Sequence, residues 1–409
     1  MIISALFSRL IQTGELTIID PSGTHLRFGP GGEPKVTIRI HDKGYAWGLL
    51  LNPSLWVGEA YMDGRLTIEQ GTLYEFLHIC TYQPEGISEP ALQIARRMLI
   101  WPLRYLRQFN PIGRSRANVA HHYDLSGRLY DLFLDADRQY SCAYFADGTE
   151  SLEQAQAKKK RHIASKLLLE PGMRVLDIGS GWGGLALYLA ECAQVDVTGL
   201  TLSTEQFELA QRRVRKSGMT DRVRFELRDY RQETGTYDRI VSVGMFEHVG
   251  VPQYQRFFDQ VRTMLKPDGV ALIHSIGRME PPGSTNAWIH KYIFPGGYSP
   301  ALSEVMRAVE KSGLYVTDIE ILRLHYADTL REWRHRFMAS WDAASELYDE
   351  RFCRMWEFFL AGYETAFRND RQMVFQMQLS RNNHTVPQTR DYMIDWERSQ
   401  ALDTIKVVA

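Results

Sequence analysis

The chain has 409 residues, which is long enough to bury a sizeable core and to form two domains. A formal net charge of -1 at pH 7 gives no overall attraction to nucleic acid, so no nucleic-acid partner is expected. The four cysteines lie far apart without a CxxC pair, which argues against a zinc site and suits a reducing cytoplasm. No apolar run is long enough to span a bilayer, so any membrane contact is predicted to be peripheral.

Residues 1–89 are predicted to form a small N-terminal α+β domain. Short alternating apolar runs at 16–19 and 36–40 are typical of strands, and Gly- and Pro-rich residues between them indicate turns. A helix is expected at about 72–80.

Residues 90–117 are predicted to be a basic linker or helix between two domains. The stretch 90–123 contains no Asp or Glu, but it carries six arginines interleaved with apolar and aromatic residues such as Trp101 and Tyr105. This mixture fits an anionic membrane surface. An interdomain helix with solvated arginines is the alternative, and the sequence leaves both open.

Residues 118–409 are predicted to form a catalytic domain of the α/β class. Five stretches read as strands separated by helices, which indicates a parallel sheet. They lie at 173–178, 195–200, 222–228, 238–243 and 269–275. Residues 330–367 read as helical, the last 30 residues as irregular, and the basic run at 158–161 as a solvated helix face.

A glycine-rich turn follows the first of these strands and opens an apolar helix. Glycines at 179, 181, 183 and 184 let the backbone approach a ligand, although a simple tight turn is the alternative. Asp177 stands just before them, where its charge would repel a pyrophosphate but would suit an ammonium group. This favours S-adenosylmethionine (SAM) over a dinucleotide.

The ends of the following strands supply the remaining polar groups of the predicted cofactor site. Asp196 lies at the start of the second strand, away from the edge where an acidic residue would bind the ribose hydroxyls. Thr201 and Gln206 are therefore expected to bind the ribose instead. The third strand ends at Asp229 and Tyr230, which are candidates for the adenine amino group and the base.

Glu247 follows the fourth strand, and His274 lies at the end of the fifth. Both are therefore expected at the same edge of the sheet. Together they offer a hydrogen-bond acceptor and a titratable imidazole beside the substrate. The chain lacks a third metal ligand at a recognisable spacing, so no metal site is predicted.

Six motifs together resemble the cyclopropane-fatty-acyl-phospholipid synthase family, which includes the mycolic acid cyclopropane synthases. The motifs are HHYDLS at 121–126, YSCAYF at 140–145, the glycine turn, GLTLSTEQ at 199–206, MFEHVG at 245–250 and YIFPGG at 292–297. The resemblance runs from about Asn118 to Arg368. The run at 56–64 is similar to the lipid-binding N-terminal domain of the phospholipid-acting members.

The resemblance implies a class I SAM-dependent methyltransferase with a Rossmann-like, mostly parallel sheet. Members transfer the SAM methyl group to a cis double bond of an unsaturated phospholipid acyl chain, and the carbocation loses a proton to close a ring. It further implies a homodimer at the inner face of the membrane.

The resemblance also implies two sets of site residues. A bicarbonate ion that acts as the base would be held by Cys142, Glu247, His274, Ile276 and Tyr326. The cofactor would be bound by Tyr123, Tyr140, Ser141, Asp177, Gly179, Gly181, Gly183, Thr201, Leu202, Gln206, Asp229 and Tyr230.

One residue departs from the family pattern. Tyr363 stands where many members have a cysteine, which puts a covalent role for that position in doubt. The expected activity does not depend on that cysteine, because ring closure needs no nucleophile. Two alternatives remain open: methyl branching without ring closure, and an inactive lipid-binding relative.

The basic stretch 90–123 gives a first prediction. Replacing Arg96, Arg97, Arg104 and Arg107 together by Gln should weaken binding to anionic vesicles by up to ~4 kcal/mol, because each arginine at the surface contributes ~1 kcal/mol. Vesicle sedimentation at low salt measures the change, and added salt should erase much of it. Parent-like binding at low salt would favour the interdomain helix.

Overall fold

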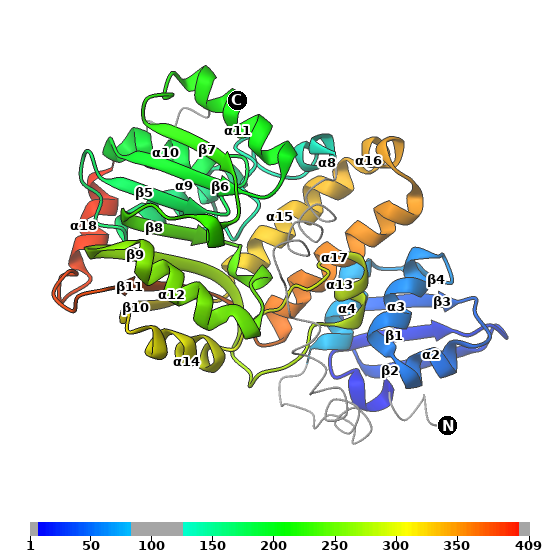
Figure 1. Cartoon of the computed structure of the whole chain (residues 1–409). Coiled ribbons are helices and arrows are strands. Elements are labelled where there is room, and N and C mark those ends of the chain that lie inside the picture. Colours follow the sequence, from blue (N-terminus) through cyan, green and yellow to red (C-terminus); the bar gives the residue numbers. More distant parts are fainter. Residues whose placement is uncertain (1–6, 83–125, 401–409) are drawn as a thin grey trace. The chain divides into compact units, whose positions relative to one another are not determined.

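The computed structural model describes residues 7–82 and 126–400 (Figure 1). The predicted boundary after residue 89, the basic linker at 90–117 and Tyr123 lie outside the described residues. Two compact units are present. Within the described ranges, no helix is both long and apolar enough to cross a membrane.

The first unit contains residues 7–82, Thr285–Pro295 and Leu330–Gln372. Its sheet has the order β2-β1-β3-β4, in which β1 (Gly14–Ile19) pairs antiparallel with β2 (His25–Gly31) and parallel with β3 (Lys35–Ile40). β4 (Leu66–Gln70) pairs antiparallel with β3. Leu16 and Ile18 are buried at alternate positions, as the period of two predicts.

The helices of the first unit come from well-separated stretches of the sequence. α2 (Tyr45–Leu51), α3 (Pro53–Met62) and α4 (Leu73–Thr81) follow the early strands, and Thr72 caps α4. α13 (Ala287–Tyr292), α16 (Trp341–Leu347), α17 (Glu350–Asn369) and the end of α15 (His325–Ala339) come later. Ala361 of α17 belongs to the same hydrophobic core as Leu16, so α17 helps to complete this core.

The second unit holds a seven-stranded sheet in the order β10-β11-β9-β8-β5-β6-β7 (Figure 1). The five predicted strands are confirmed as β5 (Arg174–Ile178), β6 (Asp196–Thr201), β7 (Val223–Leu227), β8 (Tyr237–Val243) and β9 (Leu265–Arg278). They pair in parallel. β10 (Tyr315–Leu322) and β11 (Gln372–Ser380) were not predicted, and they pair antiparallel with each other.

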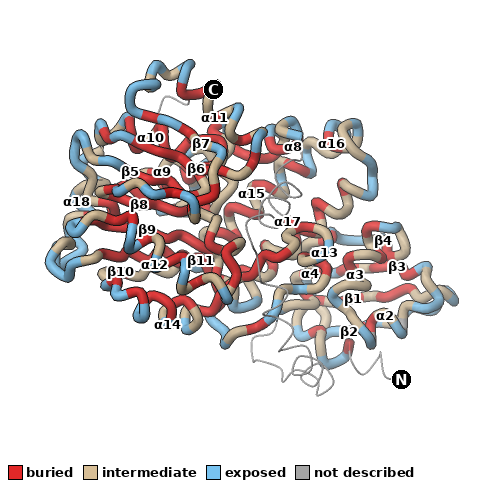
Figure 2. Tube along the Cα trace, in the orientation of Figure 1, coloured by how far each residue is buried: buried red, intermediate tan, exposed pale blue. Residues whose placement is uncertain are grey.

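Helices cover both faces of this sheet, so the mostly parallel Rossmann-like fold is confirmed. Val175 and Val241 pack in one buried cluster with α9 (Leu152–Ser165), α10 (Gly184–Ala193) and α11 (Thr204–Ser217). Their neighbours Leu176 and Ile240 pack in a second cluster with α12 (Tyr254–Met264) and α14 (Leu302–Ser312). Figure 2 shows these central strands buried along most of their length.

Short elements complete the second unit. They are α8 (Gly127–Asp131), the 3-10 turns η1 (Tyr230–Gln232), η2 (Phe246–His248) and η3 (Val251–Gln253), and α18 (Asp391–Ser399). The expectation of irregular chain over the last 30 residues was wrong at α18. This helix buries Met393, and its Glu397 accepts a hydrogen bond from His162 of α9 at 2.7 Å.

The basic run at 158–161 is not a solvated helix face, so that expectation was wrong for two of its residues. Lys159 and Lys160 are buried in α9. Lys159 follows Leu152 and Ala155 along the apolar stripe of the helix, at the spacing of the helical period. Lys160 forms an ion pair with buried Asp137, which offsets the cost of removing its charge from water.

Candidate active site

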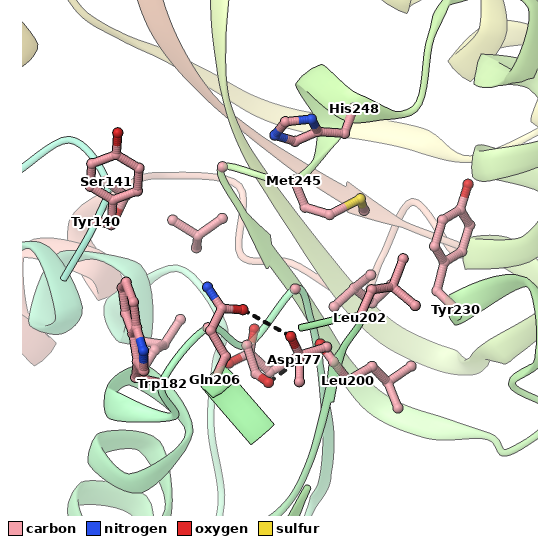
Figure 3. A pocket seen from close by; sticks show the side chains of 18 of the residues that line it. Tyr140, Ser141, Asp177, Trp182, Leu200, Leu202, Gln206, Tyr230, Met245 and His248 are labelled. Atoms are coloured by element: carbon pink, nitrogen blue, oxygen red, sulfur yellow. Dashed lines mark hydrogen bonds between the residues drawn. The ribbon is translucent and has the colours of Figure 1, made fainter. Parts of the chain in front are cut away.

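A cavity lies at the carboxyl ends of β5, β6, β7 and β8, as expected for a parallel sheet. All of the predicted cofactor-binding residues line it except Gly183 and Tyr123, the latter outside the described residues. In Figure 3, Tyr140 and Ser141 lie at the left and Tyr230 at the right, with Asp177 and Gln206 between them.

The glycine turn shapes the floor of this cavity. Gly179 has a φ of 85°, in the left-handed region, and an added Cβ would stand 2.8 Å from the Cβ of Met245. Gly183 does not line the cavity. It precedes α10, and a Cβ there would stand 2.5 Å from the Phe225 ring. The neighbouring Gly184 lines the cavity in its place.

Asp177 is the acidic group at the centre of the cavity. Its side chain is buried, and its Oδ2 atom has no hydrogen-bond partner among the described residues. Burial raises the pKa of this carboxyl to about 7, although the nearby Lys159 ammonium opposes the shift. A ligand ammonium group would supply the missing partner for this carboxylate.

The second strand ends with the pair that was assigned to the ribose. The Thr201 hydroxyl donates to the Gln206 Oε1 atom at 2.9 Å, and both residues line the cavity (Figure 3). Asp196 is the first residue of β6 and is exposed, far along the strand from this edge. The sequence reasoning about the two ends of this strand is therefore consistent with the structure.

Asp229 lines the cavity but already has a strong partner. Its two carboxylate oxygens accept from the Arg231 guanidinium at 2.8 and 2.6 Å. A carboxylate oxygen has further lone pairs, so an adenine amino group would share an oxygen with this arginine. Tyr230 lines the same part of the cavity.

The five residues assigned to the bicarbonate site do not line this cavity, but two of them are joined by a hydrogen bond. The Ile276 backbone N–H donates to the Glu247 Oε1 atom at 2.6 Å. The other oxygen, Oε2, is buried and has no partner among the described residues. Burial raises the pKa of Glu247 to about 7.

His274 is held by a residue that the sequence analysis did not identify. The Gln376 side-chain amide of β11 donates to the His274 Nδ1 atom at 3.1 Å, so the ring proton is carried by Nε2. Burial lowers the pKa of His274 to about 3. The imidazole is therefore neutral, and its Nε2–H is a hydrogen-bond donor.

Cys142 and Tyr326 are both buried in the second unit. Burial raises the pKa of the Cys142 thiol, whose Sγ atom donates to the Ala143 carbonyl at 3.3 Å. The Ala143 N–H donates to Thr329 at 3.0 Å, one helical turn after Tyr326 on α15. A neutral thiol suits a hydrogen-bonding role better than a nucleophilic one.

Tyr363, which departs from the family pattern, belongs to the first unit. Its ring lies 5.2 Å from the Phe359 ring and 6.2 Å from the Phe294 ring. The residue is therefore part of an aromatic cluster.

Several residues that line the cavity were not predicted. They include Gln139, Lys159, Trp182, Met245 and His248. The spacing of Lys159 on α9 was a usable signal, because it coincides with the apolar stripe. Trp182 lies within the glycine turn, and Met245 and His248 lie within the motif at 245–250, so membership of these motifs was also a usable signal. Gln139 gave no local signal.

Comparison with known proteins places this site in a family. A family model described as mycolic acid cyclopropane synthetase matches residues 112–377. The chain belongs to this family. It is therefore a SAM-dependent methyltransferase, and the predicted class of enzyme is confirmed.

Full-length relatives agree with the family assignment. The cyclopropane-fatty-acyl-phospholipid synthase of Escherichia coli K12 is 37% identical over 352 residues, which cover 86% of this chain and 89% of the relative. The tuberculostearic acid methyltransferase UfaA1 of Mycobacterium tuberculosis is 36% identical over 343 residues, covering 79% and 78%.

Solved structures of the family match about two thirds of the chain. The cyclopropane synthase MmaA2 from Mycobacterium tuberculosis is 33% identical with a TM-score of 0.63, covering 66% of this chain and 99% of that protein. The mycolic acid cyclopropane synthase CmaA1, complexed with SAH and CTAB, is 35% identical with a TM-score of 0.62 and the same coverage.

Asp177 gives a prediction about cofactor binding in this family member. Asp177→Asn should weaken SAM binding roughly 10- to 150-fold, because a charge-assisted hydrogen bond is worth about 1.5–3 kcal/mol. Since only the ionised carboxylate binds a cation, the parent's affinity should fall about tenfold per pH unit below the raised pKa of about 7.

Calorimetry between about pH 5 and pH 7 measures both effects. The Asn variant should show almost no pH dependence, because it has lost the titrating group. Equal SAM affinity of parent and variant, or the same change of affinity with pH in both, would contradict the assignment of Asp177 to the ammonium group.

Proposed function

We propose that this enzyme forms cyclopropane rings in the unsaturated acyl chains of membrane phospholipids, with SAM as the methylene donor. The observation that carries the proposal is the position of Glu247. It lies on η2 between Met245 and His248, which both line the cofactor cavity, and its Oε2 atom is buried without a partner among the described residues. A group that can accept or donate a proton would thus lie next to the methyl group of bound SAM.

The chemistry explains why such a group is needed. An alkene is a poor nucleophile, so the double bond must be held close to the sulfonium methyl group. The carbocation that follows must be kept from water until it loses a proton. Ring closure in place of hydration therefore requires a dry site with a base beside the new methyl group.

The residues around Glu247 fit a bound bicarbonate ion. Bicarbonate, when bound, supplies the base that accepts the proton. With its pKa raised to about 7, Glu247 is partly protonated at neutral pH and can donate from Oε2 to an anion. His274 offers the neutral Nε2–H donor. Cys142 and Tyr326 would add further hydrogen bonds.

The identity of the acyl substrate rests on the full-length relatives. The Escherichia coli relative, named for fatty-acyl phospholipids, matches 86% of this chain. Phospholipid as the substrate, peripheral contact with an anionic membrane through 90–117, and a homodimer are parts of the same proposal. The run at 56–64 lies mostly on α3 and would contribute to lipid binding.

Methyl branching is the second candidate function. The relative UfaA1, which is 36% identical, is named a methyltransferase of tuberculostearic acid. Branching and ring closure share the carbocation and differ in the carbon that loses the proton. The arrangement of Glu247 and His274 serves proton removal in both cases.

Product analysis tests the proposed function. The purified protein is incubated with SAM and vesicles of unsaturated phospholipid, and the lipids are examined by mass spectrometry and proton NMR. We expect each product chain to gain one CH2 group and to show cyclopropane ring protons. A methyl-branch signal would favour the second candidate, and SAM binding without transfer would indicate an inactive lipid-binding protein.

Glu247 and His274 give a prediction that separates chemistry from binding. Glu247→Gln and His274→Ala should each lower turnover by up to about 10²- to 10⁴-fold, the usual contribution of a general base, because each residue is proposed to hold the bicarbonate that acts as the base. SAM affinity should change little. Exposed His384→Ala is the control, with parent turnover. Variants that lost SAM affinity but kept their saturated turnover would contradict the assignment.

A further inference from the structure

Lys159 is a buried cation in the wall of the cofactor cavity. Its side chain is 1% exposed, and the residue lines the cavity from α9. The ammonium group donates to the Gln139 Oε1 atom at 2.5 Å and to the Ser141 Oγ atom at 3.0 Å. Both acceptors also line the cavity.

The charge of Lys159 is not neutralised by an ion pair within the described part of the chain. The next residue, Lys160, pairs with Asp137, which also pairs with Arg213. An ammonium group has three N–H donors, and two are used by neutral acceptors. Asp135 and Asp137 attract the ammonium electrostatically, but neither forms an ion pair with it among the described residues. A ligand anion in direct contact would therefore stabilise this buried charge further.

Asp177 supplies the opposite charge in the same cavity. The Lys159 ammonium lies close enough to lower the pKa of the Asp177 carboxyl against the effect of burial. The cavity therefore presents one buried cation and one buried anion near each other. This pair matches a zwitterion, in which an ammonium and a carboxylate are attached to the same carbon.

The amino-acid end of SAM is such a zwitterion. SAM carries two cationic groups, the sulfonium and the ammonium, and one anionic group, the carboxylate. A buried ammonium of the protein repels the first two and attracts only the third. We propose that Lys159 binds the carboxylate of SAM while Asp177 binds its ammonium.

The residues at the two ends of the cavity support this orientation of SAM, with its adenine at one end and its amino-acid part at the other. Tyr140 and Ser141 lie on the opposite side from Tyr230 in Figure 3. With the adenine beside Tyr230, the amino-acid end of SAM reaches the side on which Ser141 accepts from Lys159. Burial lowers the pKa of Lys159 to about 8, and the ammonium still predominates at pH 7.

A comparison of two ligands tests the role of Lys159. SAM and decarboxylated SAM differ only in the carboxylate, and calorimetry at pH 7 gives the affinity of each. The parent should prefer SAM by about 10- to 150-fold, the range of a charge-assisted hydrogen bond. Lys159→Met should lose this preference by weakening SAM binding while leaving decarboxylated SAM within about threefold.

Lys158→Met is the matched control. Lys158 is the preceding residue of α9, pairs with Glu150 and does not line the cavity, so its variant should keep the parent's preference. Circular dichroism checks that both variants fold. The ligand preference of the parent tests the inference without any substitution.

The outcomes distinguish this inference from the proposed function on which it rests. Equal parental affinity for the two ligands would overturn the carboxylate contact while leaving SAM binding in place. If Lys159→Met weakened the binding of both ligands equally, the lysine would act only by positioning Gln139 and Ser141. A parent that binds neither ligand would overturn the proposed function as well.

Discussion

The buried carboxylate of Asp177 is the group around which the cofactor site is organised. Parallel strands bring it to the carboxyl edge of the sheet, and helices on both faces keep water from most of its surroundings. Its Oδ2 atom has no partner among the described residues, so binding a cation there stabilises the site. The glycine turn after β5 and the buried ammonium of Lys159 line the same cavity, and in the proposed site they would shape and complement the same ligand.

The proposed reaction needs, besides the charged cofactor site, a site of neutral hydrogen-bonding groups around the reacting carbons. The Glu247 Oε2 atom and the His274 side chain are buried. Burial raises the pKa of Glu247 and lowers the pKa of His274, so it favours the neutral form of each group. Neutral groups can hold a small anion by hydrogen bonds without adding charge beside a carbocation. The charged groups that would bind the cofactor and the neutral groups that would surround the reacting carbons thus lie close together in the chain. Met245 and His248 line the cofactor cavity, and Glu247 lies between them.

Local patterns in the sequence were sufficient to locate the central strands and to place Asp177 at the edge where the cavity lies, because a strand, a glycine turn and a helix are adjacent in the chain. They were insufficient where burial depends on distant segments. β11 was missed because its glutamines read as exposed, although Gln376 and Gln378 are fully buried in the sheet. Lys159 was misassigned because its charge outweighed its place on an apolar stripe. The hydrogen bond from Gln376 to His274 joins residues 102 positions apart, which no local pattern indicates.

A crystal structure of the protein with S-adenosylhomocysteine would test the account most directly, because that ligand keeps the amino-acid end and the adenine of SAM. We predict that its ammonium lies within hydrogen-bond distance of Asp177, its carboxylate within hydrogen-bond distance of Lys159, and its adenine beside Tyr230. A ligand bound in the reverse direction, or outside the cavity at the carboxyl ends of β5 to β8, would contradict the account.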